Sequence, residues 1–287
     1  MSELTVQSLL DTPSMEIRDV LCAGRCRHRS PEEAATGLHV VFPYRGVYVR
    51  HLGRDDAVAD ANQVLFFNHD DGYRVSHPRA GGDASLDLVL SESLVRELVP
   101  RAMLRGRSGV AFRRQRHRLD AHAQALVALL RHRLRYGHIE PLEAEALALT
   151  LVQRALGPRT THVPGGSIGR QRLVDRTKLA LASDAARRWT LAEVADVVGH
   201  SPVYLTQAFR EVEGLPLYRY QQRLRLARAL DLLAEYDDLT VLALDLGFSS
   251  HSHFSTAFRK TYGCSPSAFR SAGRRSSADR LPIDPHM

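Results

Sequence analysis

The chain has 287 residues, 44% of them hydrophobic, and its 39 basic and 32 acidic side chains give a formal net charge of +7. This length suffices for two domains. No apolar run approaches the roughly 20 residues that span a bilayer, and the N-terminus lacks a basic start followed by an apolar stretch, so we expect a soluble cytoplasmic protein. Three cysteines, Cys22, Cys26 and Cys264, are too few for a disulfide framework.

The basic residues are almost all arginine, since Lys178 and Lys260 are the only lysines. Excess arginine favours a polyanionic partner such as a nucleic acid. A GC-rich genome produces the same composition, so the net charge alone is weak support for that class of partner.

From about Asp19 to Leu90 the sequence predicts short β-strands separated by turn-forming residues. The predicted strands are 38–44, 46–52, 63–68, 73–77 and 85–91. Their close spacing predicts a small antiparallel barrel or sandwich.

Helical periodicity follows the predicted strands at 92–99, 119–137 and 141–157. The stretch 101–118 holds seven arginines and no acid, which favours a solvated connection, although it could also extend a DNA footprint or contact an acidic patch. The expected class is therefore α+β, with a β-region and helices preceding an all-α domain.

Pro and Gly interrupt every hydrophobic period at 157–169, which predicts a linker. The predicted organisation is a domain at 1–156 for effector binding or dimerisation, a linker at 157–169, an all-helical domain at 170–272 and a disordered tail at 273–287. The first helix of the second domain is expected at 170–187.

The same helix-turn-helix pattern occurs twice between Trp189 and Arg270. Four residues recur 49 positions later: Leu205, Phe209, Arg210 and Gly214 correspond to Phe254, Phe258, Arg259 and Gly263. The preceding helix recurs at 48 positions, with Ala195 and Gly199 matching Ala243 and Gly247. The turn between the two helices is therefore one residue longer in the second copy than in the first.

In the first copy, Gly199 ends one helix, while Ser201 caps the next and Pro202 lies in its first turn. Leu205, Ala208, Phe209 and Val212 fall on one face and are predicted to be buried. In each copy, the opposite face of the second helix is predicted to meet DNA bases in a major groove. These base-facing residues are Val203, Thr206, Gln207 and Arg210 in the first copy, and His251, Ser252, Ser255, Thr256 and Arg259 in the second.

Between the copies, residues 217–236 form an amphipathic pattern of about 20 residues, or roughly 30 Å of helix. One turn of B-DNA is about 34 Å, so such a rod could hold two recognition helices in successive major grooves. Arg223, Arg225 and Arg228 lie on it and are predicted phosphate contacts.

These motifs resemble the DNA-binding domain of the AraC/XylS family over about residues 170–270. The matching patterns are Leu-Ala-x-x-Ala, Gly-x-Ser-Pro-x-x-Leu-x-x-x-Phe-Arg, Leu-Gly-Phe-Ser-Ser-x-Ser-x-Phe-x-x-x-Phe-Arg-Lys and Gly-x-Ser-Pro-Ser-Ala-Phe-Arg. The second recognition face departs from the first because it holds His and short hydroxyls, so its readout of bases is expected to be weaker.

Over the stretches 42–51 and 66–83, the N-terminal half resembles, less specifically, the cupin-like sensor domain of such regulators. The resemblance implies a transcription regulator that binds double-stranded DNA, takes a small-molecule effector or forms a homodimer through its N-terminal domain, and contacts RNA polymerase if it activates transcription. The metal-binding cupin pattern is missing, with His39, His51, His69 and His77 distributed along strands and turns, so no cofactor and no metal is expected.

Other readings remain open. Cys22, Cys26 and His28 form a C-x3-C-x-H motif that could open a zinc or thiol-sensing site, although inert cysteines are the default for so short a motif. An enzyme, either a cupin-type catalyst or a cysteine that accepts alkyl groups, would need ligands or an activated thiol in the first half. A third reading is a DNA-binding protein without an effector, whose first domain only dimerises.

Overall fold

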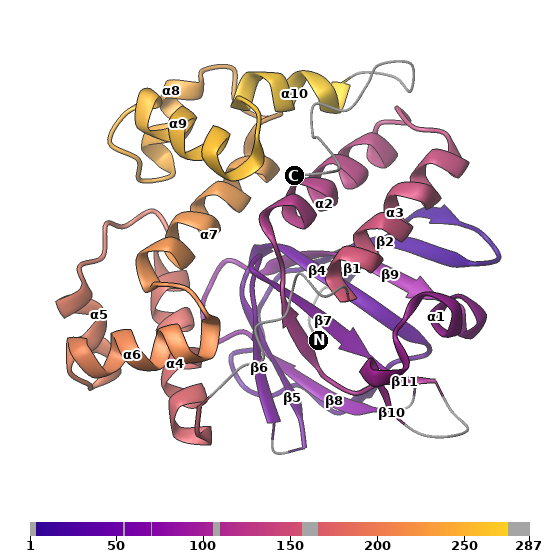
Figure 1. Cartoon of the computed structure of the whole chain (residues 1–287), viewed down its shortest axis with the longest axis horizontal. Helices are drawn as coiled ribbons and strands as arrows, with labels where there is room; N and C mark the ends of the chain where they lie inside the picture. The colour runs from indigo at the N-terminus through magenta and orange to yellow at the C-terminus, as the bar shows by residue number, and fades with distance from the viewer. Residues whose placement is uncertain (1–3, 54, 70, 106–109, 157–165, 275–287) are drawn as a thin grey trace.

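The computed structural model describes residues 4–53, 55–69, 71–105, 110–156 and 166–274, and shows a domain of two β-sheets beside a domain of helices (Figure 1). The predicted α+β class, with a β-region and helices before an all-helical part, is confirmed. Residues 157–165 of the predicted linker and 275–287 of the predicted tail lie outside the described residues. Across the described ranges, every helix is too short or too polar to cross a membrane.

The N-terminal domain contains a six-stranded sheet in the order β1-β2-β9-β4-β7-β12 and a four-stranded sheet in the order β3-β8-β5-β6. Neighbouring strands within each are antiparallel. The large sheet comprises β1 (Leu4–Asp11), β2 (Met15–Cys22), β4 (Leu38–Gly46), β7 (Gln63–Phe67), β9 (Asp83–Leu90) and β12 (Arg116–Arg118). The small sheet comprises β3 (Glu33–Ala34), β5 (Tyr48–Leu52), β6 (Asp55–Ala59) and β8 (Gly72–Ser76), and a separate pair is formed by β10 (Leu104–Arg105) and β11 (Ala111–Phe112).

The central strands of the large sheet are buried on both faces because helices cover one side and the small sheet covers the other. Along β4, Val40 and Phe42 belong to the core shared with the helices, whereas Val41 belongs to the core shared with Tyr48 of the small sheet. Strand β1 was not predicted, because it is an edge strand with no fully buried residue and therefore lacks a strict apolar alternation.

Three helices follow the strands of this domain: α1 (Glu92–Leu98), α2 (Ala121–Arg135) and α3 (Pro141–Leu156), with a 3-10 turn at Arg101–Met103. Helix α2 is buried on two sides. Its Leu126 and Leu130 pack into the core of the N-terminal domain, while Ala125 and Leu129 pack into the core of the C-terminal domain. The apolar residues of α2 are thus buried within a single chain.

The C-terminal domain consists of two groups of helices that lie at the two ends of a central helix (Figure 1). They are α4 (Ile168–Ser183), α5 (Leu191–Val198), α6 (Pro202–Glu213), α7 (Leu217–Leu232), α8 (Leu239–Asp245), α9 (His251–Tyr262) and α10 (Pro266–Arg274). The predicted length of the central helix was wrong: α7 has 16 residues, or about 24 Å. It ends early because Tyr236 is held outside it, its carbonyl accepting from Arg270 Nη1 at 2.8 Å and its hydroxyl donating to Asp245 at 2.8 Å.

Polar contacts join the two domains. Tyr220 on α7 donates its hydroxyl to buried Asp60 at 2.6 Å. Arg116 pairs with Asp175 at 3.4 Å, and Arg118 donates to the carbonyl of Glu213 at 2.6 Å. The favoured interpretation of the arginine stretch as a solvated connection is therefore wrong for these two side chains, which join the N-terminal domain to α4 and α6.

Candidate functional site

The first helix-turn-helix unit is formed by α5, a tight turn and α6. Thr190 and Glu193 make a reciprocal capping box at the start of α5, and the hydrogen bond from the Thr190 backbone lowers the pKa of Glu193 to about 2. Gly199 ends the helix with a φ of 71°, the left-handed conformation that favours glycine. Ser201 then caps α6, with Pro202 in the first turn.

Helix α6 buries the face that the sequence predicts and exposes the opposite one. Leu205, Ala208, Phe209 and Val212 are buried against α4 and α5. The exposed side chains are Val203, Thr206, Gln207 and Arg210. In this structure the Thr206 hydroxyl donates to the Pro202 carbonyl at 2.9 Å. Gln207 and Arg210 thus offer the longest polar side chains of this face.

The second unit is formed by α8, a turn and α9. Gly247, with a φ of 78°, is required at the turn, because a Cβ there would lie 1.9 Å from the carbonyl oxygen of Ala186. Ser250 caps α9, and Phe254 and Phe258 are buried beneath it. The exposed residues are His251, Ser252, Thr256 and Arg259, whereas Ser255 is half-buried and its Oγ lies 3.2 Å from His251 Nε2.

Two of the three arginines on α7 that the sequence predicts to contact phosphate donate to backbone carbonyls of the protein. Arg223 is largely buried and donates to the carbonyl of Leu119 at 2.5 Å, and burial lowers its pKa. Arg225 donates to the carbonyls of Ala185 and Arg187 at 2.9 and 2.7 Å. Both guanidiniums are thus engaged by backbone carbonyls in this structure, and the phosphate contacts expected of them stay predictions.

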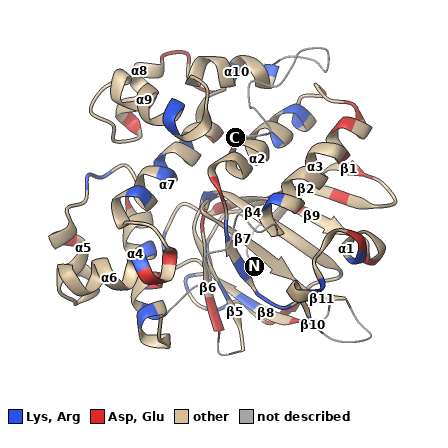
Figure 2. Ribbon diagram, viewed as in Figure 1, with Lys and Arg blue, Asp and Glu red and all other residues tan. Residues whose placement is uncertain are grey.

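Arg228 is half-exposed and pairs with the buried carboxylate of Asp231. Figure 2 shows the Lys and Arg positions along α7 and its neighbours. Exposed cations that we did not predict include Arg219 at the start of α7 and Lys260 at the end of α9. The sequence could have indicated Lys260 as an exposed cation, since it directly follows Arg259 of the repeated Phe-Arg pattern.

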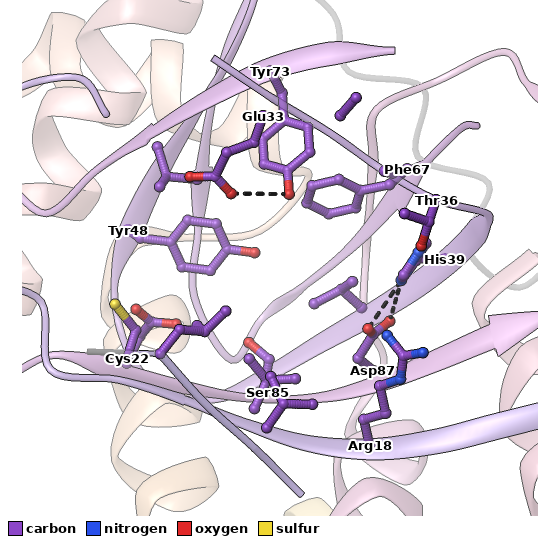
Figure 3. Close-up of a pocket in the computed structure, with 18 of the residues that line it drawn as sticks. Arg18, Cys22, Glu33, Thr36, His39, Tyr48, Phe67, Tyr73, Ser85 and Asp87 are labelled. Atoms are coloured by element: carbon purple, nitrogen blue, oxygen red, sulfur yellow. Dashed lines mark hydrogen bonds and ion pairs between the residues drawn. The ribbon is translucent and has the colours of Figure 1, made fainter. Parts of the chain in front are cut away.

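The second candidate site is a cavity of about 270 Å³ between the two sheets of the N-terminal domain (Figure 3). Its wall is mainly apolar and aromatic and includes Val41, Phe67, Tyr73 and Tyr48. Burial raises the pKa of Tyr48, so its hydroxyl stays protonated and able to donate.

Two histidines that appeared unrelated in the sequence both line this cavity. His39 pairs with Asp87 at 2.9 Å, and His77 pairs with Asp83 at 2.5 Å. In Figure 3 the His39–Asp87 pair lies at one end of the cavity and Cys22 at the other. Sequence reasoning missed this set because its members come from strands that are distant in the chain.

Comparison with known proteins supports the interpretation of the helical domain. A family model described as a helix-turn-helix domain matches residues 194–272. The HTH-type transcriptional activator RhaR of Klebsiella pneumoniae subsp. pneumoniae is 30% identical over 109 residues, covering 38% of this chain and 39% of that protein. The HTH-type transcriptional activator RhaS of Escherichia fergusonii is 40% identical over 85 residues, covering 29% and 30%.

The chain thus spans less than two fifths of the length of these curated relatives. Among solved structures, ToxT from Vibrio cholerae O395 aligns over 95% of this chain and 97% of its own, with 12% identity and a TM-score of 0.35.

The turns and helices of the C-terminal half define a double helix-turn-helix domain. The helix-turn-helix family model covers most of this domain, and the curated proteins that resemble it over this region are HTH-type transcriptional activators.

Proposed function

We propose that this protein is a transcription regulator that binds double-stranded DNA through α6 and α9. The observation that carries the proposal is the division of each helix into two faces. Both bury the apolar positions of the repeat and expose the residues predicted to meet bases, Gln207 and Arg210 on one and Thr256 and Arg259 on the other. Side chains of these kinds hydrogen-bond base edges in a major groove.

The two recognition helices are not equivalent in this proposal. On α6, Gln207 and Arg210 can each make two hydrogen bonds to one base, which gives discrimination. On α9, Ser255 is half-buried beside His251, and Arg259 is the exposed side chain of this face that can make two hydrogen bonds to one base. Helix α9 therefore contributes mainly to affinity for DNA and reads fewer bases than α6.

The test is selection of duplexes from a random pool, followed by competition between the selected duplex and random DNA. We expect affinity for the selected duplex at least about 10³-fold higher, the lower end for specific binders. Equal affinity for both would overturn the proposal.

We further propose that a small molecule binds in the cavity between the sheets and regulates DNA binding. The wall of the cavity combines apolar surface with the His39–Asp87 pair and the Tyr48 hydroxyl, which suits a ligand with an apolar body and a polar group. The cavity lies in the domain that contacts α6 and α7 through Glu213 and Tyr220, so ligand binding has a direct structural route to the DNA-binding domain.

A thermal-shift screen of metabolites tests this effector site, because a ligand that binds only the folded state raises the melting temperature. Ala34 is exposed and lines the cavity, so Ala34→Trp should narrow it and abolish the shift. Ala146→Trp, at an exposed position on α3, should keep the shift. No stabilising metabolite, or a shift that survives Ala34→Trp, would contradict the effector site.

Other partners belong to the same proposal. If the protein activates transcription, RNA polymerase is its further partner. A homodimer would have to use a surface other than the apolar sides of α2, because Leu126 and Leu129 are already buried within the chain. Sedimentation of the purified protein over a concentration series tests the homodimer.

A further inference from the structure

Cys22, His77 and Asp83 form a cluster at one end of the cavity in the N-terminal domain. Each offers one ligand atom, and these atoms lie within 4.8 Å of one another. Cys22 ends β2 and Asp83 begins β9, where the two residues are direct cross-strand partners. His77 follows the last residue of β8 in the opposite sheet. Three strand ends from both sheets thus converge on one point.

The backbone around this cluster is built for close approach. Gly24 and Gly82 pack against each other, and a Cβ on Gly24 would lie 2.5 Å from the Cα of Gly82. A Cβ on Gly82 would lie 2.3 Å from the carbonyl oxygen of Cys22. The backbone N–H of His77 also donates to the carbonyl of Cys26 at 2.7 Å. Glycine at both positions lets the Cys22 segment reach the start of β9.

Both ring nitrogens of His77 have side-chain neighbours. Nε2 lies 2.5 Å from Asp83 Oδ2, and Nδ1 lies 3.0 Å from Cys26 Sγ. The imidazole is 2% exposed, so its orientation is set by these contacts and by the surrounding wall. A histidine ligand held at its second nitrogen by another polar group is the usual arrangement at protein metal sites.

Thiolate sulfur, imidazole nitrogen and carboxylate oxygen together are a donor set that suits zinc and similar divalent ions. Tetrahedral zinc with ligands at about 2.0 to 2.3 Å would hold the three donors roughly 3.3 to 3.7 Å from one another, inside the 4.8 Å limit of this cluster. His77 Nε2 and Asp83 Oδ2 are now 2.5 Å apart, so these two atoms would separate by roughly 1 Å when an ion replaces the proton between them. His77 and Asp83 could form an ion pair without Cys22. The sulfur of Cys22 favours zinc over hard cations, which prefer oxygen ligands.

We propose that Cys22, His77 and Asp83 bind a divalent transition-metal ion of the zinc class, with Cys26 orienting His77. This replaces our expectation that the chain binds no metal and that its N-terminal cysteines are inert. The C-x3-C-x-H motif contributes Cys22 and Cys26, but its His28 is replaced by His77. All three ligands line the cavity, so the fourth coordination position faces the proposed effector.

Titration of the metal-free full-length protein with Co²⁺ tests the site, because a thiolate ligand to Co²⁺ gives a charge-transfer band in the near ultraviolet. We expect the band to saturate at a single equivalent and to be reversed by Zn²⁺. Cys22→Ser should abolish the band, while Cys264→Ser, at a buried cysteine in the other domain, should keep it. Cys26→Ser should keep the band and weaken Co²⁺ binding about 10- to 100-fold, the usual effect of losing a contact to a ligand.

Far-ultraviolet circular dichroism of each variant checks that it folds, and Asp83→Asn supplies a second ligand variant of unchanged shape, which should weaken Co²⁺ binding. Absence of the band in the wild-type protein, or its persistence in folded Cys22→Ser, would overturn the metal site. DNA binding is measured separately, so these outcomes do not depend on the proposed regulatory function.

Discussion

Arg131 on α2 and Asp231 on α7 form an ion pair across the boundary between the two domains, with Arg131 Nη2 2.8 Å from Asp231 Oδ1. Both side chains are buried, at 9% and 1% exposure. Arg45 from β4 donates to the second oxygen of the same carboxylate at 2.8 Å, and Arg228 also pairs with it. One carboxylate of the DNA-binding domain is therefore held by two guanidiniums of the N-terminal domain.

We expect Asp231→Asn to destabilise the protein by about 3 to 5 kcal/mol, because it leaves the buried Arg131 without a counter-charge. Urea denaturation gives the free energy of unfolding. Asp237→Asn, at an exposed position after α7, is the matched control and should change it by less than about 0.5 kcal/mol. An Asp231→Asn protein as stable as this control would show that the ion pair does not join the domains.

Arg223→Met should destabilise the fold without changing how DNA binding depends on salt. The variant leaves the carbonyl of Leu119 without its donor, at a cost of about 1 to 3 kcal/mol. Lys260→Met, which removes an exposed cation, should instead reduce the salt slope of DNA binding by about 1 and leave stability unchanged. A reversed pattern, with the slope changed only by Arg223→Met, would restore Arg223 as a phosphate contact.

Stability should fall as the pH is lowered from about 6.5 to 4. Burial, together with the charge of Arg114, lowers the pKa of His117 from 6.5 to about 4, and burial lowers that of His132 to about 4. In this window the unfolded chain binds protons that the folded chain does not, so protonation favours unfolding, and the stabilisation is complete above the unfolded pKa.

His117→Leu should make this pH dependence of the unfolding free energy shallower, because leucine takes up no proton. His28→Leu, at an exposed position, should leave it unchanged. Identical pH dependence in the wild type and His117→Leu would contradict the assignment.

The sequence predicted local structure well wherever a local signal existed. The end of α5 follows from Gly199, and the start of α6 from Ser201 and Pro202, because caps and turn glycines act over a few residues. The buried and exposed faces of α6 and α9 follow from the helical period in the same way.

What the sequence could not predict depends on contacts between distant segments. Arg223 and Arg225 would be exposed on an isolated α7. Their guanidiniums donate to backbone carbonyls only because Leu119 and Ala185 lie beside this helix in the folded chain. The cluster of Cys22, His77 and Asp83 is likewise invisible along the chain, because it depends on strand register and on the approach of two sheets.

Gln207→Ala should cost about 1 to 3 kcal/mol of binding free energy on a selected duplex and relax the base preference at one position. Competition titration over single-base variants of that duplex measures both effects. Gln153→Ala, an exposed glutamine on α3, is the control and should leave both unchanged. Equal losses on selected and random DNA for Gln207→Ala would contradict base reading by this side chain.

The proposal that α6 and α9 each enter a major groove is tested most directly by guanine methylation interference on the selected duplex. Methylation at N7 blocks major-groove contacts, so the proposal predicts two separate groups of interfering positions, one for each helix. Thr256→Ala together with Arg259→Ala should weaken interference in one group, and Gln207→Ala in the other. A single group of positions, or interference that does not respond to either set of substitutions, would contradict the account.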